Sequence, residues 1–462
     1  MTAAGYMTSH CPGCIWAPVM IIVLVAGTPA EGLLTQELTG PGSAAEWRVR
    51  NSNGSVRTGA SVPGHVHLDL LAAGLIEDPY YRFEDKAQQW VALDSWTYST
   101  SFSVDACFSA HNRTLVLAME GVDTAADVVL NGKRLASVAN QHVRFSLPLL
   151  GIAAGANTLE VRFKSPVAYA AEQRASYPAE IKTYNAPWAN TENKTFVRKQ
   201  QCDFGWDWGP ALASVGIWRP ASVLSYKTAR LTGATSTTEL SGSNAEHWRL
   251  QVRIFLEYMP VGAARAVSLT VSLQGIASKI VVVHLPPHAA CAASGEAAAN
   301  GEDTSQLQEL TASAVLLVPV SAVDRWWPNG HGKQSLYNLS VALTEGSSDV
   351  PGDQEGSHRQ RGRRLEGGYD DSPCSDSVDM LTRRVGFRTA ELVREPDSDG
   401  IEFGSTFFLR VNGRPIFAKG SSWVPADAFD SRLSREVLRR LLGSAAEVRS
   451  PLLCLLPCHC LR

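Results

Sequence analysis

Short runs of alternating hydrophobic and polar residues fill the first half of the chain. From about Glu31 to Ser225, segments such as RTLVLAME and NTLEVRFKSPV repeat with the period of two that β-strands require. The dipeptide Asn131-Gly132 separates two of these runs, and both residues tolerate the positive φ angles of a tight hairpin turn. The pattern predicts an antiparallel β-sandwich over residues 31–225.

A second set of strand patterns predicts another, smaller sandwich over residues 226–392. Runs such as HWRLQVRIFLEY and AVSLTVSLQG follow one another at the spacing of an immunoglobulin-like module. Two stretches within it, 286–306 and 345–377, are rich in small and polar residues that cannot bury much apolar surface. We expect both to be disordered surface insertions.

The pattern changes after Pro396. A second turn signal, Asn412-Gly413, precedes an apolar strand expected at Ile416 to Ala418. A helix is predicted from Arg432 to Glu447, with Asp430 or Ser431 as its N-cap. Strand followed by helix indicates the start of a third domain over 393–447. Residues 448–462 contain two prolines and resemble nothing before them, so we interpret them as an aberrant tail.

The composition and the N-terminal sequence argue against a nucleic-acid-binding protein and favour a secreted one. The 462 residues carry a net charge of −3, which lacks the basic surplus of a nucleic-acid-binding protein. Residues 1–30 contain an apolar run, Ile15 to Ala26, that is too short to span a membrane and is typical of a signal peptide. We therefore expect a secreted or lumenal protein and no membrane partner. Four glycosylation sequons agree with this route: Asn53, Asn112, Asn193 and Asn338.

The densest group of chemically informative residues is RKQQCDFGWDWGP at 198–210. Trp206 and Trp208 could stack on the apolar faces of a sugar while the Asp207 carboxylate accepts hydrogen bonds from its hydroxyls. The alternative is that both tryptophans are core residues and Asp207 holds the turn. In an extended segment the two indoles would lie on one face and Asp207 on the other.

Two other groups favour structural roles. His65 and His67 have the spacing of a metal-ligand pair, but no third ligand lies nearby, which favours ordinary histidines with hydrogen-bond partners. Trp326 and Trp327 precede a Pro-Asn-Gly turn and are expected to pack a sandwich against its neighbour, with Arg325 stacking on them. No nucleophile elbow, Walker A loop or HExxH motif occurs in the sequence.

Several longer segments carry a family resemblance. They include VPGHVHLDLLAAGLIEDPYYRFED at 62–85, FVRKQQCDFGWDWGPALASVGIW at 196–218, RWWPNGHGKQSLYNLSV at 325–341 and NGRPIFAKGSSWVPADAF at 412–429. Over about residues 31–447 the chain resembles lysosomal β-mannosidases of glycoside hydrolase family 2. The resemblance implies a mainly β chain: a jelly-roll, galactose-binding-like sandwich, an immunoglobulin-like sandwich, and the incomplete start of a (β/α)8 barrel.

The resemblance also implies an activity. Family members hydrolyse terminal, non-reducing β-D-mannose residues of β-mannosides, as in N-glycan breakdown in the lysosome, by a retaining mechanism with two glutamates. No cofactor or metal is implied, and a monomer is expected. Trp206, Asp207 and Trp208 match the loop thought to bind mannose, and Trp423 and Asp427 match the first barrel strand and its loop. Both catalytic glutamates are expected in barrel segments that the sequence does not reach, so no catalytic residue is assigned. The alternative is a non-catalytic carbohydrate-binding or decoy protein.

Overall fold

The computed structural model describes residues 32–40, 43–109, 112–150, 152, 155–181, 193–241, 246–260, 265–287, 306–345, 378–396, 404–418 and 423–447. The predicted signal peptide (1–30) and tail (448–462) lie outside these residues, as do nearly all residues of the two predicted insertions. None of the helices in the described ranges is long and apolar enough to cross a membrane.

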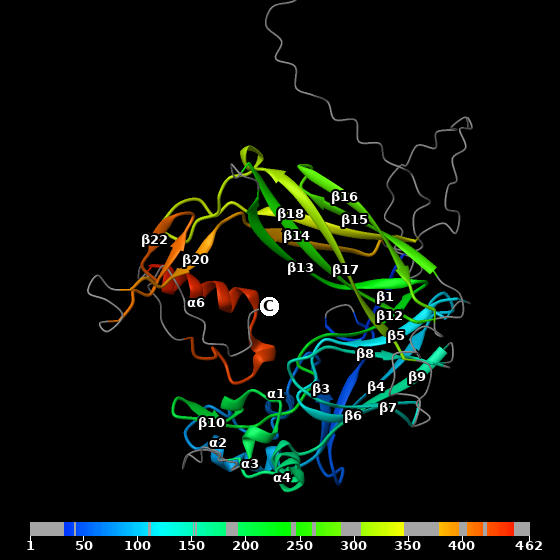
Figure 1. Cartoon of the computed structure of the whole chain (residues 1–462). Helices are drawn as coiled ribbons and strands as arrows, with labels where there is room; N and C mark the ends of the chain where they lie inside the picture. The colour runs from blue at the N-terminus through cyan, green and yellow to red at the C-terminus, as the bar shows by residue number, and fades with distance from the viewer. Residues whose placement is uncertain are drawn as a thin grey trace, which may run out of the picture.

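The first part of the chain forms a sandwich of two antiparallel sheets, drawn in blue to green at the bottom of Figure 1. The larger sheet has the order β3-β2-β4-β9-β6-β7, with strands at Arg57–Ala60, Trp47–Asn51, Trp96–Val104, Gly155–Phe163, Ala125–Leu130 and Lys133–Ala139. The smaller sheet has the order β1-β12-β5-β8, with strands at Leu34–Glu37, Ala221–Tyr226, Thr114–Met119 and Phe145–Pro148.

The core of this lower sandwich follows the strand alternation seen in the sequence. Along β4, every second residue from Trp96 to Val104 is buried, including Tyr98 and Phe102, while the alternate residues point to the partly exposed outer face. The Asn131-Gly132 turn joins β6 to β7, with φ angles of 50° and 81°. The predicted turn is confirmed. The first and last strands of the sandwich, β1 and β12, pair with each other.

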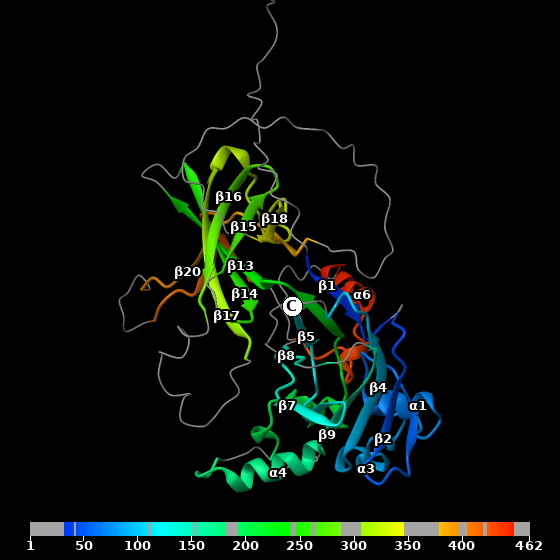
Figure 2. The ribbon, with the colours of Figure 1, turned by 90° about the vertical axis from the view of Figure 1, so that its right-hand side faces the viewer.

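The second sandwich is immunoglobulin-like and lies above the first in Figures 1 and 2. One sheet contains β13 (Ala229–Ser241), β14 (His247–Tyr258) and β17 (Gln308–Pro319), in that order. The facing sheet has the order β16-β15-β18-β19, with strands at Ala277–Leu285, Arg265–Leu273, Tyr337–Glu345 and Met380–Val385. Trp248 is fully buried between them and contacts the Phe387 ring at 5.7 Å between centroids.

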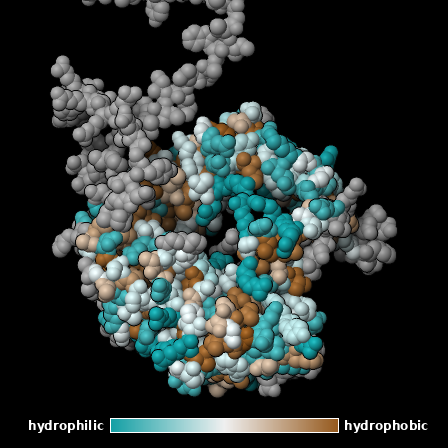
Figure 3. All heavy atoms as spheres, turned by 180° about the vertical axis from the view of Figure 1, so that it is seen from behind, coloured by the Kyte–Doolittle hydropathy of each residue, from teal (hydrophilic) through white to brown (hydrophobic). Residues whose placement is uncertain are grey.

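Several short elements cover one end of the lower sandwich and carry the candidate site. They are α1 (Val66–Ala72), α2 (Glu84–Ala87), α3 (Gln89–Leu93), α4 (Pro166–Ser176), two 3₁₀ turns at Lys194–Phe196 and Gln201–Asp203, and the hairpin strands β10 (Phe204–Trp206) and β11 (Gly209–Ala211). Figure 3 shows the opposite face of the molecule, where hydrophobic side chains gather mainly over the lower half.

The last described part is small and mixed. Strands β20 (Ala390–Val393), β21 (Phe408–Val411) and β22 (Arg414–Ile416) form a three-stranded antiparallel sheet with the predicted Asn412-Gly413 turn between β21 and β22. Helix α6 spans Arg435–Glu447 and has no buried residue. No closed barrel forms among the described residues.

Two predicted boundaries in this part are wrong. The strand expected at Ile416 to Ala418 ends at Ile416, and the next side chain, Phe417, is 76% exposed. The helix begins three residues later than predicted, after a 3₁₀ turn at Asp430–Arg432. Its first turn is capped by Ser434, whose Oγ accepts a hydrogen bond from the Val437 amide at 3.2 Å.

Candidate functional site

The predicted sugar-binding residues lie at the tip of a short hairpin. Trp206 ends β10 and pairs with Gly209 at the start of β11, so Asp207 and Trp208 form a two-residue turn. Gly205, with φ of +97°, occupies a conformation that side chains disfavour and sets the path of the strand into the turn. The segment is therefore a reversing turn and not the extended strand considered from the sequence.

Both indoles of this hairpin are accessible. Trp206 is 40% and Trp208 is 45% exposed, and their rings lie 6.5 Å apart at 44°. The Asp207 side chain between them is exposed as well. The exposure rules out the alternative in which both tryptophans are core residues. The turn thus presents two aromatic faces and one carboxylate to solvent.

The base of the hairpin is anchored in an apolar cluster. Phe204 is fully buried against Ala92 of α3, Ala170 of α4, and Val197 and Ala213 from the loops before and after the hairpin. The sequence did not single out Lys194, whose ammonium group lies 4.9 Å from the Trp206 ring centroid. Partial burial lowers the pKa of Lys194. A cation over one indole face leaves the opposite face as the one available to a ligand.

A buried ionic cluster lies beneath the hairpin. The Lys199 ammonium is fully buried and contacts the Asp123 carboxylate and, at 2.6 Å, Oδ2 of Asp203. Burial raises the pKa of Asp203 to about 7 against the opposing effect of Lys199. Burial alone would lower the pKa of Lys199, but the two carboxylates raise it above its usual value. Lys199 is therefore a charged group with two acidic partners.

The two histidines of the VPGHVH segment are buried beside this cluster. His65 Nε2 lies 3.8 Å from Asp123 Oδ2, and His67 Nδ1 lies 2.9 Å from Ser214 Oγ. Burial lowers the pKa of His65 to about 4 and that of His67 to about 3, so both rings are neutral at neutral pH. Within the described ranges, no group of three or more His, Cys, Asp or Glu side chains is arranged to hold a metal ion.

The segment after β22 docks onto the same region. Phe429 is fully buried, with its ring 5.8 Å from the His65 ring, 5.8 Å from the His67 ring and 6.1 Å from the Tyr80 ring. Tyr80 donates a hydrogen bond of 2.6 Å to Oδ1 of Asp427. The start of the third part is thus fixed to the lower sandwich.

The other predicted contacts of this segment have structural surroundings. Asp427 also accepts from the Phe429 amide at 3.0 Å and pairs with Arg432 at 3.0 Å, which fully engages its carboxylate. Trp423 is half-buried at the start of the docked segment. The structure brings Trp206, Asp207 and Trp208 together at one turn, and it places Asp427 in the docking contact.

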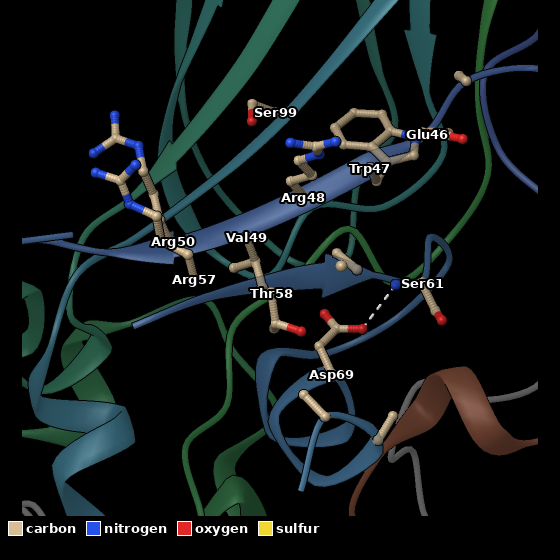
Figure 4. Close-up of a pocket in the computed structure, with 15 residues that line it drawn as sticks. Glu46, Trp47, Arg48, Val49, Arg50, Arg57, Thr58, Ser61, Asp69 and Ser99 are labelled. Atoms are coloured by element: carbon tan, nitrogen blue, oxygen red, sulfur yellow. Dashed lines mark hydrogen bonds between the residues drawn. The ribbon is translucent and has the colours of Figure 1, made fainter. Parts of the chain in front are cut away.

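A large hollow elsewhere on the lower sandwich is distinct from the hairpin. It has a volume of about 940 Å³ and is lined by β2 and β3, with Arg48, Arg50 and Arg57 pointing outward from adjacent strands (Figure 4). Asp69 lies at its floor, where Oδ1 accepts a hydrogen bond of 2.7 Å from the Ser61 amide. None of its lining residues belongs to the hairpin.

The Trp326-Trp327 pair has the structural setting predicted for it, with different cationic partners. Arg388 stacks on Trp326 at 4.5 Å and Arg414 lies 5.6 Å from the Trp327 ring centroid, whereas Arg325 is exposed. The Trp326 carbonyl accepts a hydrogen bond of 2.9 Å from the Asn412 side chain. These contacts join the upper sandwich to the three-stranded sheet.

Comparison with known proteins shows which family the chain resembles. Residues 47–219 match the family model described as the glycosyl hydrolase 2 galactose-binding domain-like family. The chain is 31% identical to β-mannosidase from Capra hircus over 436 residues, which is 93% of this chain and 43% of the relative. It is 30% identical to β-mannosidase B from Aspergillus terreus, over 82% of this chain and 38% of the relative.

Solved structures with a similar fold include a β-mannosidase as well. The β-D-mannosidase from Dictyoglomus thermophilum superposes with a TM-score of 0.69 at 27% identity, over 89% of this chain and 43% of that one. An exo-chitosanase from Amycolatopsis orientalis, at 19% identity and a TM-score of 0.56, shares the fold. The chain resembles the enzymes of glycoside hydrolase family 2, and within them the β-mannosidases. It spans about two fifths of the length of these relatives.

Proposed function

We propose that the chain belongs to a β-mannosidase-type exoglycosidase that removes terminal, non-reducing β-D-mannose from β-mannosides, and that the 204–211 hairpin contributes to its sugar subsite. The observation that supports this most directly is the pair of exposed indoles flanking an exposed carboxylate. An indole face stacks on the C–H face of a pyranose, and a carboxylate accepts hydrogen bonds from two adjacent hydroxyls. Stacking gives affinity, and the hydroxyl contacts distinguish one sugar from another.

The bond cleavage itself is assigned to a complete barrel. In a retaining mechanism one carboxylic acid protonates the glycosidic oxygen while a second carboxylate attacks the anomeric carbon, and water then hydrolyses the glycosyl-enzyme. We assign neither carboxylate to a residue of the sequence. The hairpin residues would bind and orient the mannose ring at the mouth of such a barrel.

The binding half of this proposal can be tested on the 462-residue chain itself. Titration with methyl β-D-mannoside, followed by NMR or calorimetry, is expected to show binding. Asp207→Asn should weaken it about tenfold or more, because a hydrogen bond to a charged group is worth about 1.5–3 kcal/mol. Trp208→Ala should also weaken it, because it removes one of the two stacking faces. Asp105→Asn, which changes an exposed aspartate elsewhere, is the matched control. Equal binding of methyl β-D-glucoside would contradict the mannoside specificity.

The catalytic half is tested with a complete barrel. We expect 4-nitrophenyl β-D-mannoside to be hydrolysed by a chimaera in which residues 1–447 continue into the rest of the Capra hircus β-mannosidase, and not by the 462-residue chain. Asp207→Asn in the chimaera should lower kcat/KM about tenfold or more. Turnover by the 462-residue chain that disappears with Asp207→Asn would contradict the assignment of catalysis to the barrel.

We further propose that the protein reaches the lysosome through the secretory pathway and acts in glycoprotein N-glycan catabolism. Three of the four sequon asparagines, Asn53, Asn112 and Asn338, are exposed, which suits glycosylation. Expression in mammalian cells should give a protein whose mass falls on treatment with an N-glycanase. A protein that remains in the cytosol without glycans would contradict this route.

A further inference from the structure

A fully buried lysine lies directly under the candidate sugar-binding hairpin. Lys199 lies just before the 3₁₀ turn Gln201–Asp203 that leads into β10, and its partner Asp203 is the last residue before the hairpin. The Asp203 carbonyl also accepts a hydrogen bond of 2.7 Å from the Ala213 amide, just after β11. Asp203 therefore holds both ends of the hairpin, one through its carboxylate and one through its backbone.

The second partner of the lysine ties this base to the sandwich. Asp123 is fully buried two residues before β6, and its backbone exchanges two hydrogen bonds of 2.9 Å with Gly216. The ammonium of Lys199 thus bridges the hairpin base to a position fixed by the sheet. Without the lysine, two carboxylates would share a dry site, and like charges at such a site repel strongly.

The cluster also reaches the docked segment by two routes. His65 contacts Asp123 with Nε2, and its Nδ1 lies 2.8 Å from Ser431 Oγ. The second route runs through Gln200. Its side chain donates a hydrogen bond of 3.0 Å to the Asp203 carboxylate, and its backbone N–H donates one of 2.8 Å to the Gln141 side-chain oxygen. The Gln141 side chain lies 3.5 Å from Asp430. Both routes end in the 3₁₀ turn that precedes α6.

From this geometry we infer that Lys199 is a positioning residue, which sets the place of the Trp206-Asp207-Trp208 turn relative to the segment 427–432. The inference rests on the proposed function for the identity of the sugar, but the mechanical coupling stands on the contacts alone. In the proposed enzyme, the hairpin carries one wall of the mannose site and segment 427–432 begins the domain that carries the other. The lysine would then fix the distance between the two walls.

Hydrogen–deuterium exchange of the full chain tests the coupling without any sugar. Lys199→Met removes the charge at similar length, and we expect exchange in both 204–213 and 427–433 to rise about tenfold or more, while β14 in the upper sandwich is unchanged. Lys164→Met is the matched control, because Lys164 forms an exposed ion pair of 2.9 Å with Glu172 on the same sandwich. If either segment exchanges no faster than in Lys164→Met, the inference is overturned.

A charge-balanced variant separates positioning from folding. Lys199→Met leaves two buried carboxylates without their cation, which destabilises the whole domain, so Lys199→Met/Asp123→Asn removes the cation and one anion together. We expect the double variant to recover most of the lost Tm while exchange in 204–213 stays fast, because Asp203 still has no cation. Recovery of slow hairpin exchange together with Tm would show a merely structural role and overturn the inference.

Sugar affinity provides the last readout. In the folded double variant, methyl β-D-mannoside should bind the full chain at least fivefold more weakly than it binds the unmodified chain. Unchanged affinity with fast hairpin exchange would overturn the positioning role. If the unmodified chain binds no mannoside, the proposed function fails, and the positioning of the hairpin is then judged by the exchange data alone.

Discussion

The docking of the third part depends on one aromatic side chain, and Phe429→Ala tests that dependence. Phe429 is fully buried among the rings of His65, His67 and Tyr80, so truncation empties a cavity lined by aromatic rings. Removing a buried phenylalanine costs about 3–5 kcal/mol in a protein core. Here the remaining attachments are mainly polar, such as Tyr80 to Asp427 and His65 to Ser431. The loss should therefore appear as opening of this segment before the sandwich unfolds.

The size of the effect follows from that cost. A loss of about 3 kcal/mol raises the open population of the segment about a hundredfold. Amide exchange should show it directly, because the Ala428 amide donates to Tyr80 Oη at 3.0 Å and the Phe429 amide donates to Asp427. Opening also hydrates His65, so its pKa should rise from about 4 toward the ordinary value near 6.5, measured by NMR titration.

A matched control lies twelve residues earlier. Phe417→Ala changes a residue of the same type that is 76% exposed, and surface substitutions of this kind usually alter stability by less than about 0.5 kcal/mol. The reasoning is refuted if Phe429→Ala accelerates exchange in 427–433 no more than Phe417→Ala does. It is also refuted if the His65 pKa stays near 4 in the opened variant.

Two further predictions concern the lower sandwich. Burial raises the pKa of Asp69 from 3.8 to about 6, so the folded state holds an extra proton between these values and loses stability as pH rises through 6. In urea unfolding, the free energy of unfolding of Asp69→Asn minus that of the natural chain should be about 2–3 kcal/mol larger at pH 8 than at pH 4. The same difference at both pH values would contradict this. Gly216→Ala would place a Cβ 2.2 Å from the Gly64 carbonyl oxygen, so it should lower Tm by many degrees, whereas Gly59→Ala, with no neighbour within 4 Å, should shift Tm by a few degrees at most.

The elements that the sequence predicts well are those set by local chemistry. Asn131 and Asn412 each precede a glycine, and both pairs adopt the positive φ angles that a tight hairpin needs. The alternation along the strands also predicts the buried face correctly, as Trp96 and Tyr98 of β4 show. Such features need no knowledge of distant segments, because the turn and the pleat are decided within a few residues.

The cap of α6 shows why a local pattern can fail. Asp430 and Ser431 are good N-cap residues, yet their side chains lie toward Gln141 and His65 of the lower sandwich. Burial of Phe429 holds the residues that follow it, Asp430–Arg432, in a 3₁₀ turn, so the helix starts later and Ser434 caps it. Tertiary contacts determined the boundary, and these contacts join residues separated by about three hundred positions or more.

The buried cluster was beyond sequence reasoning for a related reason. Lys199 and Asp203 have the i, i+4 spacing of an ordinary surface ion pair, and only Asp123, 76 positions earlier, makes the site a buried one. A charge that is buried this completely is tolerated only when all its partners are in place. Substituting one partner therefore acts on the others, and the turn residues Trp206 to Trp208 cannot be transferred to another sandwich as an independent motif.

This dependence bears on how the hairpin can function. An exposed turn with two indoles gains little affinity if binding must first order it, because fixing side chains and backbone costs conformational free energy. The packing of Phe204 in its apolar cluster and the ion pair between Asp203 and Lys199 order the hairpin when the chain folds. That conformational cost is therefore not charged to sugar binding. The same cluster contacts segment 427–432, so in the proposed enzyme one buried charge would set the position of both walls of the site. A binding site formed by two parts of a chain needs such a shared contact, because otherwise each part could shift independently and change the distance between the groups that bind the sugar.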